Sequence, residues 1–191
     1  MATFKTIHVL IGGFAQRPYG LGNSIPVIAD DLRKRFSSPD VLICEFPWFT
    51  GGIAEYIARR CEPKQTRVQI AGYSWGGQTA ADVACELVGY VSGVDLQLTL
   101  SDAVARRSRF PGAGWASAFR PLSKIVVPDE ARVVSFIQRV DRWPWPRGHK
   151  VVTVSGREIP QVELGLTHTR MDGAEDFSRE VVAVAEGIQA K

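Results

Sequence analysis

The chain has 191 residues, of which 45% are hydrophobic and 23% are charged, and its formal net charge is +3. This composition excludes an intrinsically disordered chain and a dedicated nucleic-acid binder, and the length suffices for one substantial core. We therefore expect one globular domain over residues 1–191.

Potential metal-binding side chains are scattered along the sequence. The cysteines are Cys44, Cys61 and Cys85, and the histidines are His8, His149 and His168. No close spacing links them, which excludes a thiolate metal site or a disulfide framework. We expect free thiols and no bound metal.

The first apolar run, residues 6–11, follows Lys5 and could be mistaken for a secretion signal. His8 interrupts the run and Gly12 closes it, so it is too short for a signal core or for the ~20 residues that span a bilayer. We expect a strand of a cytoplasmic protein without a membrane span.

Farther along, short apolar runs alternate with segments of helical periodicity, which is typical of β-α-β units around a parallel sheet. Strands are predicted at 6–11, 41–46, 67–71, 95–100 and 132–138, with short strands at 151–154 and 161–164 that could form a hairpin. Helices are predicted from Ser24, at 52–60, after residue 74 and at 174–188. The pattern predicts an α/β fold with three layers, α/β/α, and a mostly parallel central sheet. Residues 103–129 show a weak pattern and are expected to form loops, short helices and a lid.

The segment Gly72-Tyr73-Ser74-Trp75-Gly76 lies between the third strand and a helix rich in small residues. Glycines two residues on either side of the serine let strand and helix approach closely, so that the hydroxyl is presented above the sheet edge. The alternative is a glycine-rich turn in which Ser74 only caps the helix. We interpret Ser74 as a nucleophile.

A nucleophilic serine needs a base that titrates near neutrality, which favours histidine. His8 lies within the first strand, where a core role is expected, and His149 lies in a Trp-Pro loop that we expect to be exposed. His168, between the 161–164 strand and the last helix, is the predicted base.

Two aspartates follow predicted strands and could orient the histidine. Asp102 directly ends the fourth strand, whereas Asp141 stands between Arg139 and Arg142, a pattern typical of a surface salt bridge. We prefer Asp102 and keep Asp141 as the alternative.

The motifs GYSWGG at 72–77 and IGGF at 11–14, with the chain order Ser, Asp, His, resemble the α/β-hydrolase family. The resemblance covers nearly the whole chain, as a compact, minimal form that is similar to serine esterases and lipases without a large cap domain. It implies cleavage of an ester or thioester through an acyl-serine, with no cofactor. The family places its catalytic histidine where His168 stands. Most members take the acid from the later strand, as Asp141 would be, and some lipases from the earlier strand, as Asp102 would be.

The resemblance also implies an oxyanion hole made of two backbone N–H groups. One donor is the residue after the nucleophile, Trp75. The other comes from the loop after the first strand, where Phe14 is the first choice and Ala15 the second, because this chain has Gly-Gly where the usual pattern starts with His-Gly.

Aromatic residues are frequent in the loops expected above the strand ends, which favours an apolar acyl or aryl group in a small-molecule substrate. Candidate substrate contacts are Gly13, Trp48, Tyr73 and Trp143. The alternative is that several of these aromatics pack against the sheet.

The rival hypothesis is a binding module of the same fold without catalysis. Its binding loops would be rich in tryptophan and basic residues, and nucleic acid would be one possible partner. These residues are Arg106, Arg107, Arg109, Trp143, Trp145, Arg147 and Lys150. We prefer the enzyme and expect no nucleic-acid partner, because a degenerate hydrolase has no need for Ser74, Asp102 and His168 together.

Overall fold

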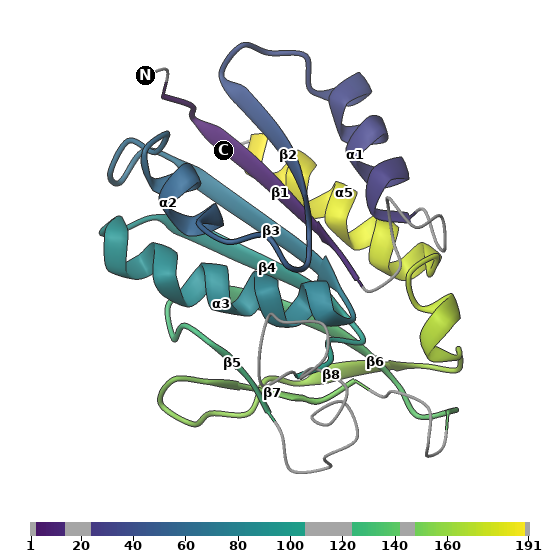
Figure 1. Ribbon diagram of the computed structural model, residues 1–191. Helices are drawn as coiled ribbons and strands as arrows, with labels where there is room; N and C mark the ends of the chain where they lie inside the picture. The colour runs from purple at the N-terminus through teal and green to yellow at the C-terminus, as the bar shows by residue number, and fades with distance from the viewer. Residues whose placement is uncertain (1–2, 14–23, 106–123, 142–147, 190–191) are drawn as a thin grey trace.

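Figure 1 shows a computed structural model of the protein, which describes residues 3–13, 24–105, 124–141 and 148–189. Its main sheet has six strands in the order β2-β1-β3-β4-β6-β8. Every neighbouring pair in this sheet is parallel. The strands are β1 (Thr6–Gly12), β2 (Val41–Pro47), β3 (Arg67–Tyr73), β4 (Asp95–Ser101), β6 (Arg132–Gln138) and β8 (Gln161–Leu164).

Helices cover both faces of the sheet (Figure 1). On one face lie α1 (Ser24–Arg35) and α5 (Glu175–Gln189), and on the other lie α2 (Ile53–Ala58) and α3 (Trp75–Tyr90). The predicted three-layer α/β/α fold with a parallel central sheet is therefore confirmed. Within the described residues, no helix combines the length and the apolar character that crossing a bilayer requires.

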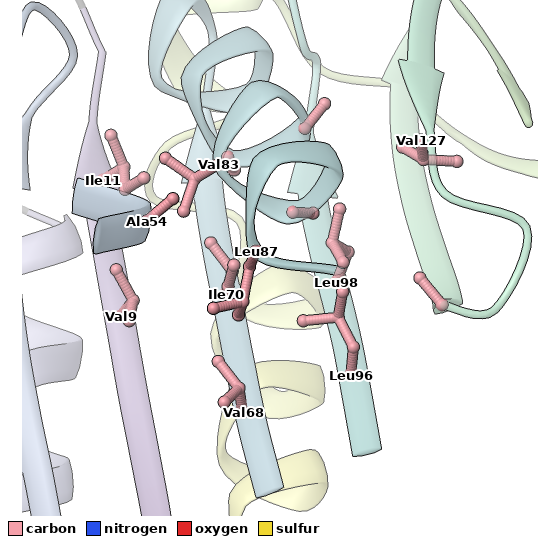
Figure 2. Close-up of a cluster of buried hydrophobic side chains, with 14 of the residues drawn as sticks. Val9, Ile11, Ala54, Val68, Ile70, Val83, Leu87, Leu96, Leu98 and Val127 are labelled. Atoms are coloured by element: carbon pink, nitrogen blue, oxygen red, sulfur yellow. The ribbon is translucent and has the colours of Figure 1, made fainter. Parts of the chain in front are cut away.

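The core follows from the alternation of side chains along the strands. On β3, Val68 and Ile70 point toward α3, whereas Ala71 points toward α1 and α5. Figure 2 shows the larger cluster, in which aliphatic side chains of β1, β3 and β4 meet those of α2 and α3. Both faces of the sheet are buried, and the face toward α2 and α3 is uniformly aliphatic, whereas the other face also buries polar side chains such as His8, Gln69 and Thr99.

The strand order has a topological switch point between β1 and β3, in the middle of the sheet. The chain leaves β1 toward α1 on one face and leaves β3 toward α3 on the other. Parallel sheets bind ligands at such a switch point, outside the carboxyl ends of the strands. Gly13, after β1, and Ser74, after β3, stand at this point.

The turn from β3 into α3, residues 72–76, is called the elbow, and two of its glycines allow α3 to lie against the sheet. A Cβ atom on Gly76 would stand 2.3 Å from the backbone oxygen of Ile11, and one on Gly72 would stand 2.5 Å from the backbone oxygen of Gly76. No other residue fits either place without movement of the backbone. The elbow therefore has the close strand-to-helix approach that its spacing predicts.

The structure differs from the prediction in the last third of the chain. A strand, β5 (Lys124–Val127), lies inside the region expected to be loops, and it pairs in parallel with β7 (Lys150–Thr153). β8 pairs in parallel with β6 and not with β7, so the predicted pairing of the two short strands is wrong. The chain does turn back at Ser155 and Gly156, but there β7 meets the residues before β8, through an antiparallel bridge between Val152 and Glu158. Strands of four residues carry too little periodicity to identify their partners. The lid prediction falls largely on residues 106–123, which lie outside the described residues.

Candidate active site

Ser74 occupies a sharp turn between β3 and α3. Its backbone has φ 55 and ψ −122, values that a residue with a side chain rarely adopts. The neighbouring strand holds this turn in place, because the Ser74 N–H donates to the Ser101 carbonyl at 3.0 Å. The Ser74 carbonyl in turn accepts the N–H of Val104 at 2.9 Å. The hydroxyl is thereby fixed at the carboxyl edge of the sheet.

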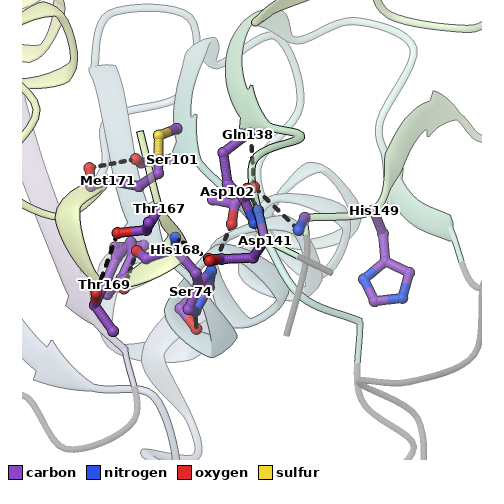
Figure 3. Close-up of polar contacts among 12 residues, drawn as sticks. Ser74, Ser101, Asp102, Gln138, Asp141, His149, Thr167, His168, Thr169 and Met171 are labelled. Carbon is purple, nitrogen blue, oxygen red and sulfur yellow. Dashed lines mark hydrogen bonds and ion pairs between the residues drawn. The ribbon is translucent and has the colours of Figure 1, made fainter. Parts of the chain in front are cut away.

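Three side chains from distant parts of the sequence meet at this edge (Figure 3). The Ser74 Oγ lies 2.9 Å from Nε2 of His168, and Nδ1 of His168 lies 2.5 Å from Oδ2 of Asp102. Ser74 comes from the elbow, Asp102 from the end of β4, and His168 from a short 3₁₀ turn, η1 (His168–Arg170). The structure thus brings together the three residues that the sequence singled out.

Asp102 is fully buried, and its second oxygen is also occupied. Oδ1 accepts the backbone N–H of Gln138 at 3.1 Å and that of Gly148 at 3.0 Å. Its own N–H donates to the Phe136 carbonyl at 2.8 Å. Burying a carboxylate without hydrogen-bond partners is costly, and these backbone donors supply them. The arrangement fixes the orientation of the oxygen that faces the imidazole.

Gly148 lies against this carboxylate. A Cβ atom at position 148 would stand 2.2 Å from Oδ1 of Asp102, so that only glycine lets the backbone N–H approach. Sequence reasoning missed Gly148, because a glycine beside a Trp-Pro loop has the appearance of an ordinary turn residue.

Tyr73 holds the histidine from another side. The Tyr73 ring stacks on the His168 ring, with centroids 5.3 Å apart, and its hydroxyl donates to the His168 carbonyl at 2.7 Å. Burial raises the pKa of Tyr73 far above its usual value, and the charges of Asp172, Asp102 and Asp141 raise it further. Tyr73 is therefore a neutral donor throughout the physiological pH range.

Asp141, the alternative acid, contacts the backbone of His168. Its Oδ2 accepts the His168 N–H at 2.5 Å, whereas Asp102 contacts the ring. Of the two arginines that suggested a surface salt bridge, Arg139 donates to the Gln138 carbonyl at 3.2 Å, and Arg142 lies outside the described residues.

His149 is buried, contrary to the expectation of an exposed loop residue. The backbone N–H of His149 donates to the Ala103 carbonyl at 2.8 Å, and the ring Nδ1 accepts the backbone N–H of Ala105 at 3.0 Å. In Figure 3 its ring points away from Ser74 and His168. These contacts join the residue before β7 to the chain just after Asp102. This proximity depends on tertiary packing, so no local pattern in the sequence predicts it.

No family model matches the sequence, and the search of curated proteins found no match. Among solved structures, one of RedJ with a PEG molecule bound in its active site is 14% identical, with a TM-score of 0.50 over 95% of this chain and 90% of that chain. An iodinated complex of acetyl xylan esterase is 11% identical, with a TM-score of 0.39 over 95% of this chain and 97% of that chain. The chain has the α/β-hydrolase fold. At 14% identity the likeness to the RedJ structure concerns the fold alone.

In this α/β-hydrolase fold, Gly13 lies directly beside the elbow. A Cβ atom on Gly13 would stand 2.9 Å from the Tyr73 carbonyl oxygen and 3.0 Å from Cβ of Ser74. The loop after β1 therefore starts against the serine. Phe14 and Ala15, the candidates for the second oxyanion donor, lie outside the described residues. Trp75, the candidate for the first, is the opening residue of α3.

The aromatic residues predicted to bind substrate differ in their surroundings. Trp48 and Trp75 are both buried, with ring centroids 4.8 Å apart, and they pack with Val104. Phe49 stacks edge-on against Trp48 and is 44% exposed. Trp143 lies outside the described residues. For Gly13, Trp48, Tyr73 and Trp143, contact with a substrate stays a prediction.

Proposed function

We propose that the chain is a serine hydrolase of the α/β-hydrolase family, formed by a single domain, and that it cleaves a carboxylic ester or thioester. The observation that carries this proposal is the connected set of Ser74 Oγ, His168 Nε2, His168 Nδ1 and Asp102 Oδ2, with distances of 2.9 and 2.5 Å. A serine, a histidine and a buried carboxylate in this order activate a hydroxyl for attack on a carbonyl carbon.

The reaction proceeds in two halves. Ser74 Oγ attacks the carbonyl carbon while Nε2 of His168 takes the hydroxyl proton, and the protonated imidazole then gives this proton to the departing alcohol or thiol. Water next attacks the acyl-serine with His168 again as base, which releases the carboxylic acid and restores the hydroxyl. Asp102 keeps the imidazole proton on Nδ1 and stabilises the imidazolium.

The negative oxygen of each tetrahedral intermediate requires fixed donors. We assign this role to the backbone N–H groups of Trp75 and Phe14. The position of Trp75 at the start of α3 adds the favourable end of a helix dipole, and loss of one such donor typically costs about 10²–10³ in turnover. The aromatic residues in the loops that follow the strands favour a small substrate with an apolar acyl or aryl group, and Phe49, which is 44% exposed, is the described aromatic of this group most accessible to one.

The proposal predicts covalent labelling of one serine. A fluorophosphonate probe is expected to add once to the wild-type protein and not to Ser74→Ala, as measured by intact mass. Ser37→Ala removes an exposed serine outside the site and should label like the wild type. Labelling of Ser74 would be followed by hydrolysis assays on aryl esters and acyl thioesters of increasing chain length.

The opposite result has an equally clear meaning. If neither the wild type nor Ser74→Ala gains an adduct while circular dichroism shows both to be folded, the enzyme proposal is wrong. The rival hypothesis of a binding module with the same fold would then stand.

A further inference from the structure

Two carboxylates hold His168 at two different places. Asp102 accepts a hydrogen bond from the ring through Oδ2, and Asp141 accepts one from the backbone N–H through its own Oδ2, each at 2.5 Å. The hydrolase mechanism uses only the first. The second carboxylate comes from a different strand end, three residues beyond β6.

Gln138 connects these two carboxylates. Its backbone N–H donates to Oδ1 of Asp102 at 3.1 Å, and its side-chain Oε1 accepts the backbone N–H of Asp141 at 2.9 Å. Gln138 is fully buried as the last residue of β6. One rigid strand end therefore sets the position of Asp141 relative to Asp102.

The backbone of His168 needs an external acceptor. His168 is the first residue of a three-residue 3₁₀ turn, and the N–H groups at the start of a helix have no partner within it. Thr167 precedes the turn and makes no side-chain cap. Asp141 accepts the N–H instead, while the Tyr73 hydroxyl donates to the carbonyl of the same residue at 2.7 Å. Both polar backbone groups of His168 are thereby fixed from outside the turn.

We propose that Asp141 is a positioning residue, an inference that rests on the proposed function. Asp141 holds the backbone of His168 so that the imidazole ring lies between Ser74 and Asp102 and contacts both. Asp141 acts through the acceptor oxygen that it offers to the backbone, and Asp102 alone orients the ring. An amide oxygen can replace that carboxylate oxygen, whereas a leucine of similar size cannot.

The test compares Asp141→Asn, Asp141→Leu and Asp102→Asn by the second-order rate constant of fluorophosphonate labelling. Asp141→Asn is expected to stay within about threefold of the wild type, because the hydrogen bond survives. Asp141→Leu is expected to fall by roughly 10²-fold, the usual effect of a small misplacement of a catalytic group. Asp102→Asn is expected to fall by about 10⁴-fold, as in the worked serine-protease case.

A second measurement does not depend on reactivity. The proton on Nδ1 of His168, in its short bond to Asp102, should give a downfield proton NMR signal. The signal is expected in the wild type and in Asp141→Asn and should be lost or shifted in Asp141→Leu. Asp141→Ala provides a second removal of the acceptor, and thermal unfolding identifies any variant that does not fold.

Two outcomes overturn the inference. If Asp141→Leu and Asp141→Ala label at the wild-type rate and keep the signal, Asp141 positions nothing. If Asp141→Asn is as slow as Asp102→Asn, Asp141 acts through its charge. A wild type that does not label, but whose NMR signal still depends on residue 141 as described, contradicts the proposed function and leaves the positioning role supported.

Discussion

Gly148 shows how a residue without a side chain can control a buried carboxylate. Its backbone N–H reaches Oδ1 of Asp102 at 3.0 Å because there is no Cβ atom in the way. A methyl group would force the carboxylate or the loop to move. Since Asp102 also contacts the His168 ring, such a movement would be transmitted to the proposed base.

We therefore predict that Gly148→Ala lowers the fluorophosphonate labelling rate by at least tenfold. The matched control is Gly165→Ala, because an added Cβ atom at position 165 would meet nothing within 4 Å. The control should label like the wild type. Equal labelling by the two variants would contradict the view that Gly148 keeps Asp102 in place.

Two residues of the candidate site have strained backbone conformations. Among the described residues other than glycine, only Lys64, Ser74 and Asp102 have positive φ. Ser74 and Asp102 end adjacent strands, and each such residue typically costs about 1–3 kcal/mol. The neighbouring hydrogen bonds hold both residues in these conformations. Backbone strain at these two residues of the candidate site is consistent with the proposed enzyme.

At the scale of elements, α3 depends on its close contact with β1 and β3. Gly76 lies at the contact, whereas Gly89 is exposed on the same helix, and an added Cβ atom there would meet nothing within 4 Å. Substitutions at these two positions therefore test the effect of packing and the effect of helix propensity separately, within the same helix.

We predict opposite effects of alanine at these two positions. Gly76→Ala should lower the free energy of unfolding by about 2 kcal/mol or more, because the new Cβ atom would overlap the Ile11 carbonyl. Gly89→Ala should raise it by about 0.5 kcal/mol, because alanine has the higher helix propensity. Urea denaturation measures both, and a loss of similar size at both positions would contradict this account of the contact.

At the scale of the whole molecule, a buried histidine far from the site links stability to pH. The Gln69 side chain donates to the Val181 carbonyl of α5, so its oxygen accepts the Nδ1–H of His8, at 2.8 Å. Nε2 of His8 has no partner among the described residues. Burial lowers the pKa of His8 from 6.5 to about 4, so the ring stays neutral in the folded protein at pH values where the unfolded chain binds a proton.

This predicts that the protein loses stability as pH falls from about 6.5 to about 4. Only the unfolded state takes up the proton in that range, and the total loss is about 3 kcal/mol at roughly 1.4 kcal/mol per pH unit. His8→Gln keeps a donor for Gln69 but does not titrate, so its unfolding free energy should fall less over the same range. Parallel curves for the two proteins, measured by urea denaturation at each pH, would disprove the role of His8.

Local patterns in the sequence were enough to predict most of the main sheet and the position of Ser74. The apolar runs around Val9, Ile70 and Leu98 are buried on both faces of the sheet, and such runs are visible without knowledge of any partner strand. The spacing of Gly72, Ser74 and Gly76 has a local physical cause, because the same short turn needs all three. The catalytic roles of Ser74, Asp102 and His168 stay predictions.

Only the tertiary structure decided which atoms meet across the sheet edge. The sequence offered Asp102 and Asp141 as rivals for one role, whereas the fold places one carboxylate on the ring of His168 and the other on its backbone. It also buries His149 and sets Gly148 against Asp102. These contacts join residues far apart in the chain, and their distances depend on how β4, β6 and β7 are aligned, which no local pattern encodes.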